Sequence, residues 1–170
     1  TMATWKRIQP GYIGGAQATD ETSSTANFPL GVTMQAKDCD YSTDYGAGEF
    51  IYLKGVASTA VGSVVTFNRD DHSTALLAAD AKGPVAVAMS ANVANQYGWY
   101  QIRGKAVAKV LASFADGADV YATSTAGSVD DAVVAGDVIV GAKSASAIGT
   151  PSSGLAEIEI DNPFVFDGVI

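Results

Sequence analysis

The sequence predicts an all-β protein: a small β-sandwich or barrel-like domain with an extended N-terminal arm. From Phe28 onward, short runs of β-branched and aromatic residues recur, with Gly, Asp or Ser between them. Several strands at such spacing are typical of sandwiches and barrels. The run GLAEIEID at 154–161 alternates apolar and acidic residues with the period of a half-buried strand. No Gly-x-Gly-x-x-Gly motif and no alternation of strands with helices occurs, which argues against a nucleotide-binding α/β fold.

The first 27 residues are predicted to form the arm, and residues 28–170 the domain. A proline and several glycines at 10–15 interrupt any regular element in this segment. Trp5, Ile8 and Tyr12 are large apolar side chains that are costly to leave in water. We therefore expect the arm to pack on its own domain or on a neighbouring subunit, through Trp5, Ile8, Tyr12 and, at the junction, Phe28.

The strands of the domain are predicted from β-type runs that end at turn residues. In chain order they cover residues 49–57, 63–70, 83–90, 98–104, 105–112, 118–124, 136–145 and 154–161. Helix signals are weak: residues 73–81 could form one or two turns. Apolar residues between 107 and 114 have helical spacing, but their neighbours favour a strand.

An aromatic stretch, NQYGWYQIRGKAVAKV at 95–110, is the strongest candidate for a binding surface. On a strand, Tyr97 and Trp99 point to one face and Tyr100 to the other. Such a face can stack on a sugar, and protein interfaces are enriched in the same residues. The sequence leaves three alternatives open for Tyr97, Trp99 and Tyr100: the domain core or a trimer contact, a contact with another protein, or a glycan site.

Charge and composition limit the partners. The net charge of −8 argues against nucleic acid, because binding to phosphates needs clustered Lys and Arg. No run of 18 apolar residues suggests a membrane span, and no basic-then-apolar stretch suggests a secretory signal. Cys39 is the only cysteine, which excludes an intrachain disulfide and a thiolate cluster. We expect Cys39 to be a small buried residue.

Catalytic constellations are scarce because His72 is the only histidine. Together with Asp70 and Asp71 it could serve a hydrolase or hold a metal. The three residues lie in a polar turn, however, and one His beside two adjacent carboxylates is short of a catalytic metal set.

The other acidic groups are equally unspecific. Asp38, Asp40 and Asp44 lack the glycine and closing glutamate of a calcium loop. Asp130 and Asp131 are expected to face opposite ways into water, and Glu157 and Glu159 to guard the solvent side of an edge strand. We therefore expect no enzyme, no catalytic residues, no cofactor and no metal.

Five segments together resemble the small capsid decoration (cement) proteins of tailed bacteriophages, in particular the group described as a domain of unknown function in phage head gene clusters. They are GEFIYLKGVAST, VGSVVTF, GPVAVAMSANVANQYGWYQIRGKAVAKV, DVYATSTAGSVDDAVVAGDVIVGAKSAS and GLAEIEIDNPFV, at 48–59, 61–67, 83–110, 119–146 and 154–165. The resemblance covers about residues 28 to 166, and the arm matches less well.

The resemblance implies a non-enzymatic β-rich protein on the outer surface of a virion, assembled in the host bacterial cytoplasm. Its implied partner is the major capsid protein, which it would bind as a homotrimer between capsomers. It would stabilise the expanded shell against internal DNA pressure. The alternative is a carbohydrate-binding module on the virion, using the aromatic face around Trp99.

Overall fold

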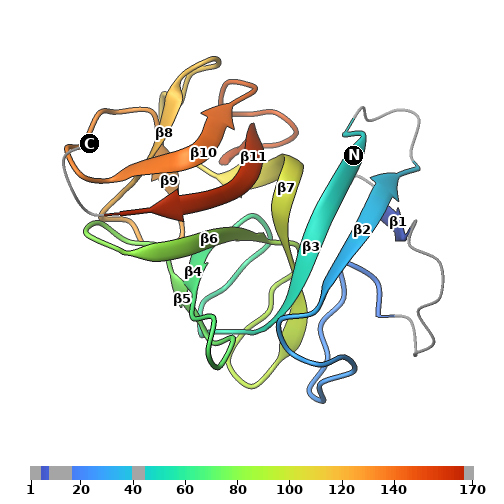
Figure 1. Ribbon diagram of the computed structural model, residues 1–170. Coiled ribbons are helices and arrows are strands. Elements are labelled where there is room, and N and C mark those ends of the chain that lie inside the picture. Colours follow the sequence, from blue (N-terminus) through green and yellow to red (C-terminus); the bar gives the residue numbers. More distant parts are fainter. Residues whose placement is uncertain (1–4, 8–16, 40–44, 167–170) are drawn as a thin grey trace.

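The protein is described here by a computed structural model, which covers residues 5–7, 17–39 and 45–166. These residues contain no helix, and their strands form one sheet with antiparallel pairing (Figure 1). The all-β prediction is confirmed. The strands are β1 (Trp5–Arg7), β2 (Thr33–Asp38), β3 (Ala47–Lys54), β4 (Val64–Phe67), β5 (Thr74–Leu76), β6 (Gly83–Ala88), β7 (Tyr97–Lys109), β8 (Asp119–Ala122), β9 (Val129–Asp130), β10 (Val138–Ser144) and β11 (Leu155–Val165).

Strand β7 joins the two halves of the molecule. Its first part pairs with β3 and β6, and its second part, from Arg103 on, pairs with β11. Gly104 lies between these parts with a φ of +97°, and a Cβ there would come within 2.6 Å of the Ala47 carbonyl oxygen. The buried amide of Gln101 donates hydrogen bonds of 3.0 Å to the carbonyls of Arg103 and Lys105. A glycine and a buried amide thus turn one strand from one half into the other.

The half at the upper left of Figure 1 is a small barrel. β7, β11, β10, β8 and β9 are hydrogen-bonded in that order. A parallel bridge between Val129 and Val110 returns β9 to the end of β7. Small and branched side chains, among them Val87, Ala108, Val120 and Ile158, fill this barrel together with the ring of Phe114. The ring closure leaves these strands with little free edge, the usual device against edge-to-edge aggregation.

The second half is built the same way from β3, β7, β6, β4 and β5. Its closure is a parallel bridge between Lys54 and Ser73, to which Thr74 Oγ1 adds a 2.8 Å hydrogen bond to the Lys54 carbonyl. Leu53, Val65 and Tyr100 are fully buried inside it. The two barrel-like halves therefore share β7, and β6 of the second half also pairs with β11 of the first.

Several boundaries differ from the sequence prediction. The two strands predicted at 98–104 and 105–112 are one, because the glycine between them bends β7 without ending it. The turn of helix considered within 73–81 is wrong, since β5 occupies Thr74–Leu76 and pairs with β4. Strand β2 was not predicted, although its burial alternates strictly along Thr33–Asp38. Its sequence TMQAKD lacks the β-branched run that marked the others.

Candidate functional site

The aromatic stretch lies in the protein interior. Trp99 is 1% exposed, and its ring packs at 5.0 Å from Tyr52 and 5.2 Å from Phe28, measured between ring centroids. Tyr100 is fully buried on the opposite face of β7, where its hydroxyl accepts a hydrogen bond from Asn92 Nδ2. Burial raises the pKa of Tyr100 above its ordinary value. Tyr97 is half-buried. The core alternative is thus the correct one for Trp99 and Tyr100, whose rings are not available to a glycan or a partner subunit.

The C-terminal part of the arm docks on its own domain. Phe28 is 4% exposed and packs on Tyr52 and Trp99. Gln17 is also buried, and its Nε2 donates a 2.9 Å hydrogen bond to the carbonyl of Tyr97. Of the two alternatives left open for the arm, its own domain or a neighbouring subunit, Phe28 takes the first. Its surface is already covered by aromatic rings of the same chain.

Trp5 docks on the same half of the molecule. It begins β1, the outermost strand, which pairs with β2. Its half-buried ring meets Phe50 edge-on at 5.0 Å, measured between ring centroids. Ile8 and Tyr12 lie outside the described residues.

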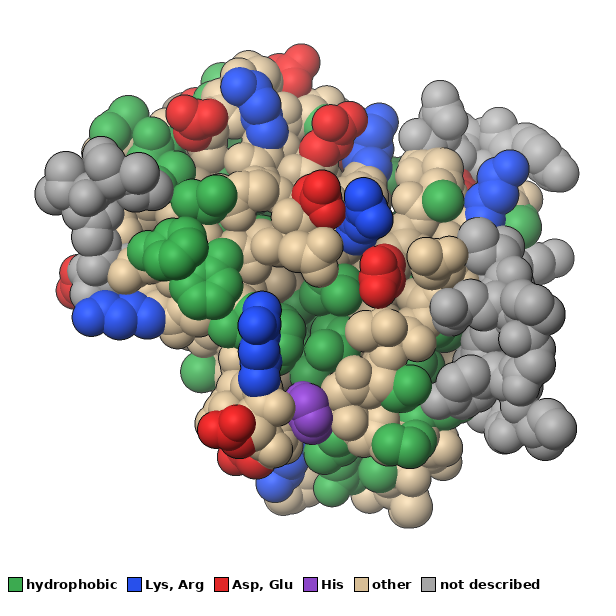
Figure 2. All heavy atoms as spheres, viewed as in Figure 1, with side chains coloured by type: hydrophobic (Ala, Val, Ile, Leu, Met, Phe, Trp, Pro, Cys, Tyr) green, Lys and Arg blue, Asp and Glu red, His purple; other side chains and the backbone are tan. Residues whose placement is uncertain are grey.

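A hollow of the described surface lies where the two halves meet, and we call it the crease. It has a volume of about 930 Å³ and runs from the start of β3 across the bend of β7 to β10 and β11. Its charged lining has both signs: Arg103, Lys105 and Lys143 against Glu49, Glu159 and Asp161. Figure 2 shows acidic and basic side chains together in the middle of this face, between β11 and β3.

Glycines keep the crease open. Gly48, Gly104 and Gly141 all line it. A Cβ at Gly141, whose φ is +81°, would come within 2.7 Å of the Asp161 carbonyl oxygen. These positions let neighbouring strands approach closely and leave backbone at the surface.

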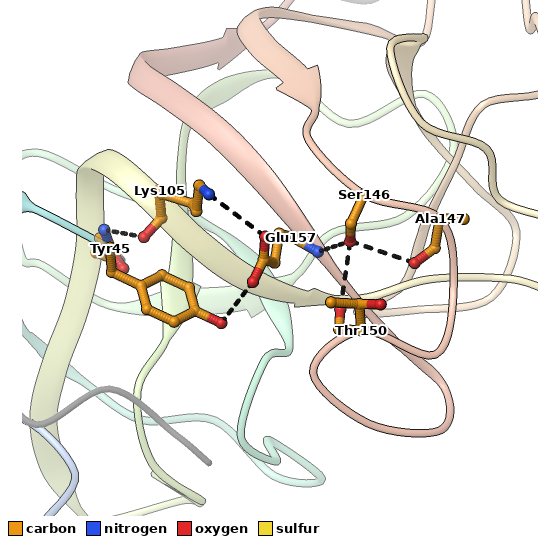
Figure 3. A network of polar contacts seen from close by, with 7 residues as sticks. Tyr45, Lys105, Ser146, Ala147, Thr150 and Glu157 are labelled. Carbon is orange, nitrogen blue, oxygen red and sulfur yellow. Dashed lines mark hydrogen bonds and ion pairs between the residues drawn. The ribbon is translucent and has the colours of Figure 1, made fainter. Parts of the chain in front are cut away.

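One side of the crease is held by a network around Glu157 (Figure 3). The hydroxyl of Tyr45 donates a 2.9 Å hydrogen bond to Glu157 Oε1, and Lys105 Nζ lies 3.5 Å from Oε2. Burial first, and then the Glu157 carboxylate, raises the pKa of Tyr45 above its ordinary value. The backbone N–H of Glu157 donates to Ser146 Oγ at 2.9 Å. The polar groups of this network all have partners, and the network holds this side of the crease in place.

The other charged pair is open to solvent. Arg103 Nε lies 3.2 Å from Asp161 Oδ1, with the two side chains 58% and 66% exposed. Such a pair contributes only about 0–1 kcal/mol to stability, because water screens it. Its groups can exchange this contact for one with a partner at small cost. Chemically, the crease is suited to a polar polypeptide surface.

The predicted acidic turn is structural. Asp71 Oδ1 accepts hydrogen bonds from the Ser73 hydroxyl at 2.7 Å and its N–H at 3.0 Å, and these bonds lower the pKa of Asp71. The His72 ring packs against Gly31, where any Cβ would overlap it. Asp70 is exposed. The Asp71 carboxylate thus holds the turn and, through Ser73, the neighbouring bridge to Lys54.

One other expectation about acidic residues was wrong, and a second holds only in part. Glu157 and Glu159 do share the outer face of β11, but β11 pairs on both sides and is not an edge strand. Asp130 is only partly exposed, and its Oδ1 is buried without a hydrogen-bond partner. Burial raises the pKa of Asp130, and the Asp131 carboxylate beside it acts in the same direction. Asp131 itself accepts a hydrogen bond from the Ala115 N–H.

No group of three or more potential metal-ligating residues occurs in the described ranges. Of the proposed calcium ligands, Asp38 is buried in β2, whereas Asp40 and Asp44 lie outside the described residues. Cys39 is half-buried rather than buried. In the part of the chain that the structure describes, no helix is long and apolar enough to cross a membrane.

Sequence reasoning missed Gln17, Tyr45 and Lys105. Gln17 stands in the predicted arm, and no local pattern there distinguishes it from its neighbours. Tyr45 and Lys105 are separated by 60 positions in the sequence, and only the pairing of β3 with β7 brings them together. No protein-family model, no curated protein and no solved structure matches the chain.

Proposed function

We propose that the protein is a non-enzymatic decoration protein of a tailed-bacteriophage head. It binds the major capsid protein on the outside of the expanded shell, as a homotrimer between capsomers. It stabilises the shell by linkage: a ligand that binds the assembled lattice and not its dissociated subunits shifts the equilibrium toward the lattice.

The observation that carries the proposal is the burial of the aromatic stretch. The alternative function, a carbohydrate-binding module, would use the same aromatic residues to stack on a sugar. Trp99 is only 1% exposed, so its ring belongs to the core and is not a sugar-binding surface. The stretch that resembles decoration proteins most specifically, QYGWYQIRGKAV, is the central strand that joins both halves. A structural role accounts for it directly.

The crease is our candidate for the capsid contact. Its exposed Arg103 and Asp161 offer charges of both signs, and its glycine backbone offers free surface for an extended segment. Trp5 supports the rim, because its ring lies against the position of Gly48, which lines the crease. The net charge of −8 suits an outward-facing protein that does not bind the packaged DNA.

Cosedimentation of the purified protein with undecorated capsids tests the proposal. We expect saturable binding to expanded shells, at a fixed copy number per capsomer junction, and none to unexpanded procapsids. Absence of binding to either form of shell refutes the capsid role.

Two substitutions test the crease within this assay. Arg103→Glu places like charges side by side with Asp161 and should weaken shell binding at least about tenfold. Arg69→Glu, an exposed position in the β4–β5 turn, is the matched control and should bind normally. Trp5→Ala should weaken binding while the domain stays folded. If both Arg103→Glu and Trp5→Ala bind expanded shells as the wild type does, the crease is not the capsid contact.

A further inference from the structure

The outer face of the first barrel carries an apolar band where solvent-facing strands usually carry polar residues. It crosses four neighbouring strands: β8, β10, β11 and β6. We call it the outer band, and its members are Pro84, Tyr121, Val138, Val140, Phe164 and Phe166.

The strand registers make the band continuous. Tyr121 lies opposite Val138, and Val140 lies opposite Phe164. Phe164 lies in turn opposite Pro84 on β6. The rings of Phe164 and Phe166 are 4.5 Å apart, measured between centroids. Directly opposed residues of neighbouring strands point to the same face, so these side chains form one surface.

The core does not need these side chains. The alternate residues Ile139 and Val165 point inward and are buried at 2% and 0% exposure. Val140 is 43% exposed and Phe166 is 53% exposed. Two further exposed valines, Val133 and Val134, stand on the loop that leads from β9 to β10. Single exposed apolar residues are ordinary, but a contiguous patch marks an interaction site. Figure 2 shows hydrophobic side chains gathered over the ends of β10 and β11 nearest the C-terminus.

A shared irregularity marks the border of the band. The register of β10 against β11 shifts between Val140 and Ala142, with Gly141 at φ +81° and Asn162 at φ +47°. Before Asn162 the outward residues of β11 are acidic, Glu157 and Glu159. Beyond it the outward residue is Phe164, and Phe166 follows directly after the strand. The same strand thus changes from a charged surface to an apolar one at a bulge.

The charge of the chain indicates the occupant. Each copy has a net charge of −8, so two copies repel when their acidic surfaces meet. No member of the outer band is charged, and two or three copies can bring the same band together around a symmetry axis. A second copy therefore fits this surface without juxtaposing like charges. We propose that the outer band is the contact between copies of this chain. This deepens the proposed function, whose homotrimer it would assemble, but its test needs no capsid.

The test is the mass of the full chain in solution, by sedimentation equilibrium over about a 100-fold range of concentration, because association follows mass action. We expect a mass that is a multiple of one chain. Val140→Asp and Phe166→Asp should weaken the association constant at least about tenfold. Thr33→Asp, an exposed strand position in the other half, adds the same charge and should leave the mass unchanged. Circular dichroism checks that each variant is folded.

A wild-type monomer across the whole range, or an oligomer that both band substitutions leave intact, overturns the inference. The two proposals fail separately. If the band substitutions weaken the oligomer but the oligomer does not bind shells, the capsid role is refuted and the outer band is supported. If the protein binds shells but the band substitutions leave its oligomer intact, the capsid role is supported and the outer band is refuted.

Discussion

The hydroxyl of Tyr52 donates a 2.7 Å hydrogen bond to Gln17 Oε1 and so joins the arm to the middle of β3. The indole N–H of Trp99 donates to the backbone carbonyl of the same glutamine at 3.3 Å. One residue of the arm therefore accepts from two buried aromatic donors, which need partners in an apolar core. The arm is part of the folded domain at this point.

Gln17→Ala should lower the free energy of unfolding by about 1–3 kcal/mol, because it leaves the buried Tyr52 hydroxyl without its acceptor. Urea denaturation measures the change. Thr22→Ala, at an exposed position of the same segment, is the control and should change stability little. Equal effects of the two substitutions would mean that the arm does not depend on the glutamine.

Trp99→Ala should cost about 3–5 kcal/mol, the usual range for removing a large buried aromatic side chain. The reason is the cavity left between Tyr52 and Phe28. Guanidinium denaturation followed by circular dichroism gives the value. A variant of wild-type stability would contradict the core position of this ring and would reopen the glycan hypothesis.

Gly141→Ala tests the bulge. The new Cβ faces the Asp161 carbonyl oxygen at 2.7 Å in a left-handed backbone conformation, so we expect a loss of about 2–3 kcal/mol. Gly117→Ala has a similar φ of +74° but open space around its Cβ. Gly117→Ala should lower the free energy of unfolding only by the strain of a left-handed backbone at an alanine, about 1 kcal/mol. Thermal denaturation of both variants separates steric overlap from backbone strain, and equal losses would rule out the overlap.

Alkaline pH should destabilise the protein. Burial raises the pKa of Tyr45, Tyr52 and Tyr100 in the folded state. Their contribution is complete below the unfolded tyrosine pKa of about 10 and is lost as the pH rises through the folded values. Urea denaturation between about pH 9 and 11 should show a falling free energy of unfolding. Tyr45→Phe should make that fall less steep, and an unchanged slope would contradict the burial of the Tyr45 hydroxyl.

Asp130→Asn should stabilise the protein at neutral pH. The folded-state pKa of Asp130 is raised, so the protonated form is favoured in the fold and stability is lost as the pH rises through that value. An amide is neutral at every pH and removes this loss. The gain over the wild type should shrink toward pH 3–4, roughly the unfolded pKa of an aspartate. Denaturation curves at both pH values check the sign, and a gain that is independent of pH would exclude titration of Asp130 as its cause.

The sequence was most informative where a local pattern of residues determines the secondary structure. Alternation at 154–161 correctly indicated β11, and β-branched runs indicated β4, β6 and β10. It could not show that β7 crosses a glycine without ending, since the buried amide of Gln101 that holds the bend belongs to no local pattern. Nor could it place Asp130, because the exposure of a carboxylate depends on strands distant in sequence.

The candidate site could not be predicted for the same reason: it depends on strands that are distant in sequence. The aromatic stretch was found from composition, but composition did not choose between core and surface. The crease and the outer band exist only through the strand registers. The homotrimer, the capsid partner and the carbohydrate alternative stay predictions until the experiments above are done.

The position of β7 also has a consequence for biosynthesis. Its partners β3 and β11 lie far from it in sequence, on either side. The half built on β3 can assemble once β7 has left the ribosome, whereas the first barrel stays open until residues 155–165 emerge. Non-local pairing of this kind makes folding slow, in the range of milliseconds to seconds. During that interval the inner face of β7 is not yet covered by β11, and the nascent chain is prone to aggregate.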